Sequence, residues 1–167
     1  MKQIQLKIKE LPRGQIMKYL FLDIDGVLNN AEDYCLGYVE KPEMFSKRCL
    51  DCLKYITDNV PELKIVLCST WRILPNWEKR VLQSGMPVDI LALIKDVTSR
   101  KMDKSEAIKD YINKHNIEIS DFAVLDDHDL KVPNQFKTHG YTGLTIIEAL
   151  KVCDLLNPDF NFPIFLF

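Results

Sequence analysis

The sequence predicts an open α/β fold in which helices cover both faces of a mostly parallel sheet. Three short runs are almost wholly apolar, as expected for strands that are buried on both faces. These runs are residues 19–22, 64–68 and 122–125. The segments between them have the spacing of amphipathic helices, and strands that alternate with helices form parallel sheets. Each run is followed by a polar residue, so we expect reactive groups to gather at the carboxyl ends of the strands.

The length of 167 residues fits a single domain. Residues 17–167 are predicted to form this domain, because the first buried run begins just after Met17. Residues 1–16 then form an N-terminal extension, and the polar–apolar alternation of residues 3–8 indicates a possible edge strand there. An apolar content of 47% supports an ordinary core and excludes general disorder.

Four segments between and after the buried runs are predicted to be helices from their caps and apolar spacing. The first begins near Ser46, and the other three cover residues 76–84, 103–115 and 145–156. Gly85 ends the second of these helices. The third and fourth begin with the spacing of capping boxes, Asp103 with Glu106 and Thr145 with Glu148.

Composition excludes several classes of function. The 22 basic and 24 acidic residues give a net charge of −2, which argues against bulk capture of nucleic acid but allows a local groove. No apolar run reaches the ~18 residues that span a bilayer, and we expect no membrane association. Five cysteines, an odd number, fit a reducing compartment, so a cytoplasmic protein is expected. Cys49 and Cys52 have the spacing of a zinc knuckle but no second ligand pair follows, which favours buried helix cysteines.

The carboxyl end of the chain, residues 160–167, is unusually apolar. We expect this tail either to pack back on the domain or to contact a partner. An oligomer is therefore possible, with the tail as its candidate contact.

Carboxylates follow two of the three buried runs. Asp23 and Asp25 come directly after the first run and before Gly26, and Asp126 and Asp127 follow the third. Like charges at such short range repel unless a cation lies among them, and oxygen-rich carboxylate sites suit Mg²⁺. The sequence therefore predicts an Mg²⁺ site formed by these four residues. The alternative is that the acids only cap the helices that follow them.

Other residues near the strand ends are candidates for phosphate or substrate binding. The hydroxyls of Ser69 and Thr70 close the second run, where neighbouring N–H groups can also hold a phosphate oxygen. Arg72 has the fork that binds a phosphate through two hydrogen bonds, and Trp71 has a face on which a base can stack. Both are equally compatible with surface packing.

Lys104, at the start of the third helix, can neutralise phosphate charge. Arg100 and Lys101 compete with it for this role. His128 lies beside the acid pair and is more simply explained as a loop residue.

The order of these residues resembles the four motifs of the haloacid dehalogenase (HAD) superfamily. Those motifs are a strand ending in D-x-D-G, a strand ending in Ser or Thr, a lysine at a helix start and a strand ending in acids. Their counterparts are residues 22–28 (LDIDGVL), residues 67–69 (LCS), Lys104 and residues 125–127 (LDD). The resemblance covers residues 17–157 and implies a Rossmann-like, three-layer α/β/α fold.

The resemblance also implies a mechanism. Asp23 would attack phosphorus to form an aspartyl-phosphate, and Asp25 would protonate the leaving oxygen and then activate water. Asp126, the backbone carbonyl of Asp25 and Asp127 would hold Mg²⁺ together with Asp23. Ser69 and Lys104 would bind the phosphoryl oxygens.

Residues 65–72 (IVLCSTWR), 124–127 (VLDD) and 143–145 (GLT) resemble more narrowly a small group of HAD domains in bacterial and phage RNA-repair proteins. A more distant resemblance is to the phosphatase part of polynucleotide kinase-phosphatases. Both imply a nucleotide or a nucleic-acid end as substrate. Residues 29–44 provide room for a short flap but not for a cap domain, so the site is expected to be open, with a minimal cap or none.

Three other functions remain compatible with the sequence. Clustered carboxylates also serve metal-dependent nucleases, which need no covalent nucleophile. A phosphatase of small metabolites would use the same four motifs. A non-catalytic phosphoacceptor or binding module also combines strand-end acids, a hydroxyl and a lysine, although receiver domains place their paired acids and acceptor Asp in the reverse order.

Overall fold

A five-stranded sheet lies at the centre of the computed structural model, which describes residues 16–163. Every neighbouring pair of strands is parallel, and the order across the sheet is β3-β2-β1-β4-β5. The strands are β1 (Lys18–Leu22), β2 (Leu63–Leu67), β3 (Ile94–Val97), β4 (Phe122–Asp126) and β5 (Gln135–Lys137). The central strand β1 is therefore the one that leads into Asp23.

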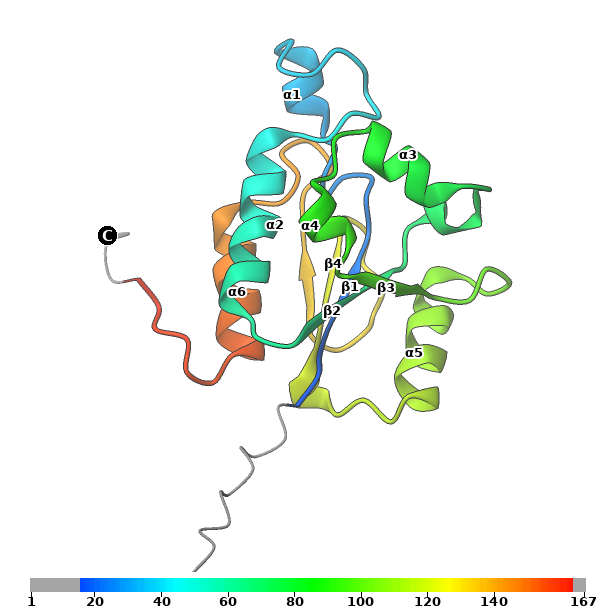
Figure 1. Ribbon diagram of the computed structural model, residues 1–167, viewed down its shortest axis with the longest axis vertical. Coiled ribbons are helices and arrows are strands. Elements are labelled where there is room, and N and C mark those ends of the chain that lie inside the picture. The colour runs from blue at the N-terminus through cyan, green and yellow to red at the C-terminus, as the bar shows by residue number, and fades with distance from the viewer. Residues whose placement is uncertain (1–15, 164–167) are drawn as a thin grey trace, which may run out of the picture.

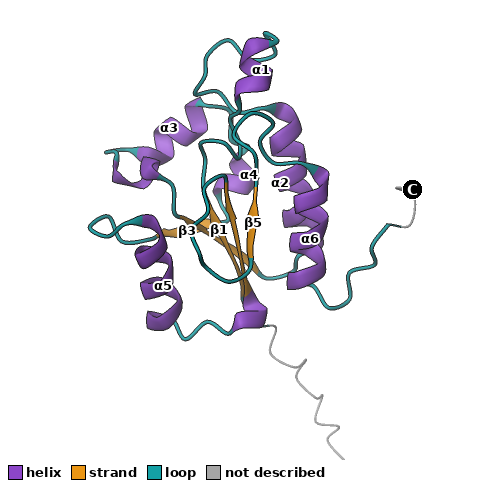
Figure 2. Cartoon of the chain, turned by 180° about the vertical axis from the view of Figure 1, so that it is seen from behind, coloured by secondary structure: helices purple, strands orange, loops and turns teal. Residues whose placement is uncertain are grey.

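Helices cover both faces of the sheet and form the outer two of three layers (Figures 1 and 2). The α-helices are α1 (Ala31–Cys35), α2 (Lys47–Asn59), α3 (Trp77–Gln83), α4 (Val88–Leu91), α5 (Lys104–Lys114) and α6 (Ile146–Leu156). Two 3-10 turns, η1 (Thr70–Ile73) and η2 (Ile119–Asp121), complete the elements.

Alternate side chains of the strands point into two separate cores. Leu20 and Leu22 of β1 pack with α2 and α6 on one face. Phe21, between them in sequence, packs on the other face with Ile108 and Tyr111 of α5. This division is the period of two that a strand buried on both faces requires.

The chain reverses its direction of travel across the sheet between β1 and β4. From β1 it moves outward to β2 and β3, and α5 then returns it over the opposite face to β4, beside β1. Open α/β sheets bind ligands at such a switch point, beyond the carboxyl ends of the strands. This edge is where Asp23 and Asp126 lie.

The predicted strands and helices agree with the structure where the apolar runs and the amphipathic segments are long. The three apolar runs form β1, β2 and β4, and the four predicted helices are α2, α3, α5 and α6. The side chain of Ser46 caps α2, and Thr145 and Glu148 form the predicted capping box. Asp103 accepts a hydrogen bond from the backbone N–H of Glu106, but the reciprocal bond of a capping box is not present there.

Several short elements were not predicted from the sequence, namely β3, β5, α1 and α4. The expected strand over residues 3–8 lies outside the described residues. Within residues 16–163, the strands are joined by short loops or by helices, with no further domain inserted, and α1 lies beyond the carboxyl ends of the strands (Figure 1). No helix among these residues combines the length and apolar character needed to cross a membrane.

The first residue of the apolar tail, Phe160, packs on the domain, whereas Phe162 is exposed, so the expectation for the tail as a whole stays a prediction. The ring of Phe160 lies edge-on to Tyr55 of α2, with 6.4 Å between ring centroids. Residues 164–167 lie outside the described part of the chain. Cys49 and Cys52 are free and buried on α2, as expected for helix cysteines.

Candidate active site

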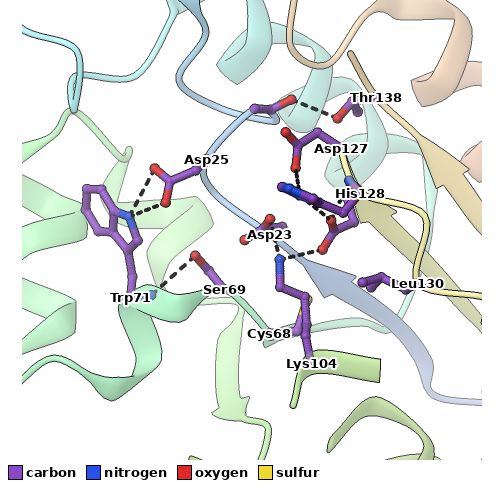
Figure 3. Close-up of polar contacts among 12 residues, drawn as sticks. Asp23, Asp25, Cys68, Ser69, Trp71, Lys104, Asp127, His128, Leu130 and Thr138 are labelled. Atoms are coloured by element: carbon purple, nitrogen blue, oxygen red, sulfur yellow. Dashed lines mark hydrogen bonds and ion pairs between the residues drawn. The ribbon is translucent and has the colours of Figure 1, made fainter. Parts of the chain in front are cut away.

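The carboxyl ends of three neighbouring strands bring the predicted acids and hydroxyl together. Leu22 of β1 is in register with Leu67 of β2 and Leu125 of β4, so the residues that follow lie side by side. The backbone N–H of Asp23 donates to the carbonyl of Leu125 at 3.0 Å and extends this pairing by one residue. Figure 3 shows the resulting group of side chains around Asp23.

Lys104 links the acids of two strands. Its Nζ atom donates to Oδ2 of Asp23 at 2.6 Å and to Oδ2 of Asp126 at 2.7 Å (Figure 3). Burial alone would lower the pKa of Lys104, but Asp23 and Asp126 together raise it, so the ammonium charge is retained. Arg100 and Lys101 are exposed on the preceding loop. Of the three candidates for the lysine motif, Lys104 is the one that contacts the acids.

Asp23 is an unfavourable place for a negative charge. Burial and the neighbouring charge of Asp126 both raise the pKa of Asp23, while Lys104 counteracts them. The side chains of Asp23 and Asp126 are 4% and 0% exposed, so solvent provides little relief. Two buried carboxylates that share one ammonium are therefore a site that a further cation would stabilise.

The side chains around Asp23 fit a hard divalent cation. Ligand atoms of Asp126, Asp127 and His128 lie within 4.8 Å of one another. The absence of a side chain at Gly26 leaves room for Asp127, because a Cβ atom at Gly26 would clash with the Asp127 carboxylate. Carboxylate oxygens are the ligands that Mg²⁺ prefers. Asp126 and Asp127 supply them within this group, and Asp23 lies beside it, on the other side of the Lys104 ammonium.

The Asp25 carboxylate, by contrast, is directed away from the other acids (Figure 3). It accepts hydrogen bonds from Nδ2 of Asn29 at 2.8 Å and from Nε1 of Trp71 at 3.0 Å. Its side chain is thus not a ligand in the arrangement described, and only its backbone carbonyl remains available to a cation. Asn29 was not predicted to belong to the site. Its signal was its position in the tight turn after Gly26, whose N–H bonds to the Asn29 side chain.

Ser69 is oriented for donation to an oxygen ligand. It is fully buried and caps η1, where its Oγ accepts the backbone N–H of Trp71 at 3.4 Å. Because the hydroxyl oxygen is used as an acceptor, its proton is left for another acceptor such as a phosphoryl oxygen. Thr70, the other predicted hydroxyl, is exposed on the same turn.

The predicted phosphate-binding role of Arg72 is wrong. The side chain turns back into the protein, and the residue is 2% exposed. Its guanidinium donates to the carbonyls of Cys68, Ser69, Ser99 and Met102, at distances between 2.8 and 3.3 Å. Arg72 therefore joins the Ser69 loop to the loop that leads into Lys104, and its donors are not free for substrate.

We expect Arg72→Ala to lower the free energy of unfolding by about 2–4 kcal/mol, because it leaves buried carbonyls without donors. Urea unfolding followed by circular dichroism measures this change. Arg100→Ala, an exposed arginine on the adjoining loop, is the control and should leave stability within about 0.5 kcal/mol. An Arg72→Ala variant of unchanged stability but weaker substrate binding would restore the original prediction.

The predicted stacking role of Trp71 also disagrees with the structure. Trp71 is 7% exposed, and its ring packs against Phe45 with 5.8 Å between centroids. The guanidinium of Arg80 lies 5.8 Å from the ring centre. Trp71 lines a pocket of about 590 Å³ together with Arg80, but with 7% of the residue exposed it offers too little surface for a base to stack on.

The sequence of residues 19–149 matches the family described as the HAD domain in Swiss Army Knife RNA repair proteins. The chain belongs to this family. Membership of the HAD superfamily, inferred from four short motifs, is thereby confirmed for this domain. None of the curated proteins matches the chain.

A solved structure shares the fold of this HAD domain. It is the N-terminal part of the protein BF1531 from Bacteroides fragilis, containing a phosphatase domain complexed with Mg. The two have a TM-score of 0.52 and 18% sequence identity, over 86% of this chain and 41% of that one. This chain thus spans less than half of that structure. The predicted Rossmann-like HAD fold is therefore confirmed, and so is the predicted family.

Proposed function

We propose that this HAD domain is an Mg²⁺-dependent phosphomonoester hydrolase that forms an aspartyl-phosphate on Asp23. The observation that carries this proposal is the contact of Lys104 with both Asp23 and Asp126 at the switch point of the sheet. This arrangement holds a carboxylate nucleophile next to a fixed positive charge and next to oxygen ligands for a cation.

The bound Mg²⁺ would neutralise charge on the phosphoryl group and on the acids, and Asp23, Asp126 and Asp127 fit it as ligands. Asp23 Oδ attacks phosphorus, and the bond from phosphorus to the leaving oxygen breaks. Lys104 and the hydroxyl of Ser69 donate to the phosphoryl oxygens as their charge grows. The ammonium of Lys104 thus has to serve the transferred group as well as the acids.

Asp25 performs the proton transfers in this scheme. In the first step its protonated carboxyl gives a proton to the leaving oxygen. In the second step the Asp25 carboxylate takes a proton from water, whose oxygen attacks phosphorus and releases Asp23. The exposure of Asp25, beside buried Asp23, fits a group that must reach both a leaving group and water.

Nucleotides or nucleic-acid ends are the substrates that we propose. The family description places relatives of this domain in RNA-repair proteins. The entrance on the Asp25 side is a pocket of about 280 Å³, lined in part by Tyr34 and Pro42 of the flap. A leaving group protonated by Asp25 would enter this pocket, where Tyr34 is 45% exposed and available for stacking. Tyr34 thus replaces Trp71 as the candidate aromatic contact.

We expect Tyr34→Ala to raise KM for a phosphorylated oligonucleotide about tenfold, since stacking on one base contributes ~1–3 kcal/mol. The KM for a sugar phosphate should stay within about twofold, because it has no base to stack. Tyr38→Ala, at a more exposed tyrosine of the same flap, is the matched control. Equal losses on both substrates would remove Tyr34 from base recognition.

A substrate panel tests the proposed function as a whole. Mononucleotides, 3′- and 5′-phosphorylated oligonucleotides and sugar phosphates would be compared for phosphate release. Preference for sugar phosphates would indicate a phosphatase of small metabolites, and cleavage within an oligonucleotide would indicate a nuclease. A stable phosphoenzyme without turnover would indicate a phosphoacceptor.

A further inference from the structure

The indole of Trp71 holds the Asp25 carboxylate through both of its oxygens. Nε1 lies 3.2 Å from Oδ1 and 3.0 Å from Oδ2 (Figure 3). Asn29 donates to Oδ1 only. Two segments, the turn after β2 and the turn after β1, therefore meet at this one side chain.

The indole is itself held firmly. Its ring packs against the phenyl ring of Phe45 and lies near the guanidinium of Arg80, and the residue is 7% exposed. Its backbone N–H bonds to the Ser69 hydroxyl. The same short turn thus places the hydroxyl that faces the phosphoryl group and the donor that faces Asp25.

We infer that Trp71 is a positioning residue for the acid/base Asp25, an inference that rests on the proposed function. Indole N–H is a donor that cannot accept a proton, so it orients the carboxylate without competing for the proton that Asp25 transfers. Among the described residues, Oδ1 accepts two donors and Oδ2 accepts only Trp71. Oδ2 is therefore the oxygen with more capacity to carry the proton to the leaving group.

Trp71→Phe tests this role, because it keeps an aromatic ring against Phe45 and removes only the donor. For an alkyl phosphate, whose leaving oxygen needs a proton, we expect kcat/KM to fall roughly tenfold or more. For 4-nitrophenyl phosphate, whose leaving group departs without a proton, kcat/KM should change by less than about threefold. Equal losses on both substrates, or no loss on either, would overturn the inference.

The other tryptophan provides the matched control. Trp77 begins α3, is partly buried and packs against the core. Trp77→Phe should leave both substrates within about twofold of the wild type, since it changes no donor to Asp25.

A double-mutant cycle shows whether Trp71 acts through Asp25. In an Asp25→Asn background, Trp71→Phe should change the residual rate by less than about twofold. A loss as large as in the wild-type background would mean that Trp71 acts elsewhere, and the inference would fail.

Fluorescence tests the contact without any turnover. In the Trp77→Phe variant, Trp71 is the remaining tryptophan. Asp25→Ala in that background removes the acceptor of its N–H, and we expect the emission maximum or intensity to change. Unchanged emission would contradict the contact. A wild-type protein that hydrolyses no phosphomonoester would refute the proposed function instead, whatever the emission shows.

Discussion

Asp23→Asn is expected to abolish turnover and to leave the fold intact. The amide has the shape of the carboxylate but no anionic oxygen to attack phosphorus, so we expect kcat to fall roughly 10³-fold or more. Phosphate release at saturating Mg²⁺ measures the loss. Asp129→Asn, at an exposed aspartate near the site, is the control and should retain activity.

The stability of the Asp23→Asn variant is expected to change in the opposite sense to its activity. Burial and the charge of Asp126 raise the pKa of Asp23, so the ionised side chain is held in the folded state at a cost. The neutral amide removes that repulsion and leaves Lys104 paired with Asp126. We expect the melting temperature to be no lower than that of the wild type, which thermal unfolding measures.

Trapping experiments separate the covalent mechanism from its alternatives. Acid quenching of the wild-type protein with ³²P-labelled substrate should leave label on the chain, and Asp23→Asn should carry none. Substantial activity of Asp23→Asn would rule out the aspartyl-phosphate. Label at another residue would move the nucleophile elsewhere.

The sequence was sufficient to predict the centre of the sheet because its strands are buried on both faces. Burial on both faces forces nearly every residue of β1, β2 and β4 to be apolar, which leaves a plain signal. The edge strands β3 and β5 have one neighbour each and are mostly half-buried, so polar residues such as Lys95 and Gln135 are tolerated. Their sequences contain too few apolar residues to stand out.

Burial of the central strands also explains which site residues could be predicted from the sequence. Asp23, Ser69 and Asp126 follow buried strands whose register is fixed, so their meeting was predictable. Lys104 was already placed at the predicted helix start, but its contacts with Asp23 and Asp126, which distinguish it from Arg100 and Lys101, are visible only in the structure. Motif spacing alone does not determine which of three nearby cations points inward.

The direction of a side chain after a strand end could not be predicted. Trp71 and Arg72 follow Ser69 directly, and the sequence left open whether they face substrate or the interior. The 3-10 turn that Ser69 caps decides it, by turning Arg72 toward backbone carbonyls and Trp71 toward Asp25. Both side chains bind protein groups of the site, Asp25 and backbone carbonyls, and their position next to Ser69 in the sequence does not reveal this.

Asp126→Ala is expected to weaken Mg²⁺ binding and to remove most of the activity. Asp126 is fully buried, and one of its oxygens accepts the backbone N–H of His128 at 2.9 Å while the other accepts Lys104. Its carboxylate is thus held in one position, as a ligand of the proposed Mg²⁺ needs to be. Without it, we expect the Mg²⁺ concentration for half-maximal activity to rise at least roughly tenfold and kcat to fall about 10²-fold.

The loss of Asp126 also changes what Lys104 does. With Asp126 gone, Lys104 has Asp23 as its remaining partner at the site, so the ion pair with the nucleophile competes with the transferred phosphoryl group. Higher Mg²⁺ should therefore restore only part of the rate. Binding itself can be followed by the rise in melting temperature on adding MgCl₂, which we expect in the wild type and in the exposed control Asp129→Ala but not in Asp126→Ala. Full wild-type activity in excess chelator, or an unaltered Mg²⁺ response in Asp126→Ala, would contradict the metal site.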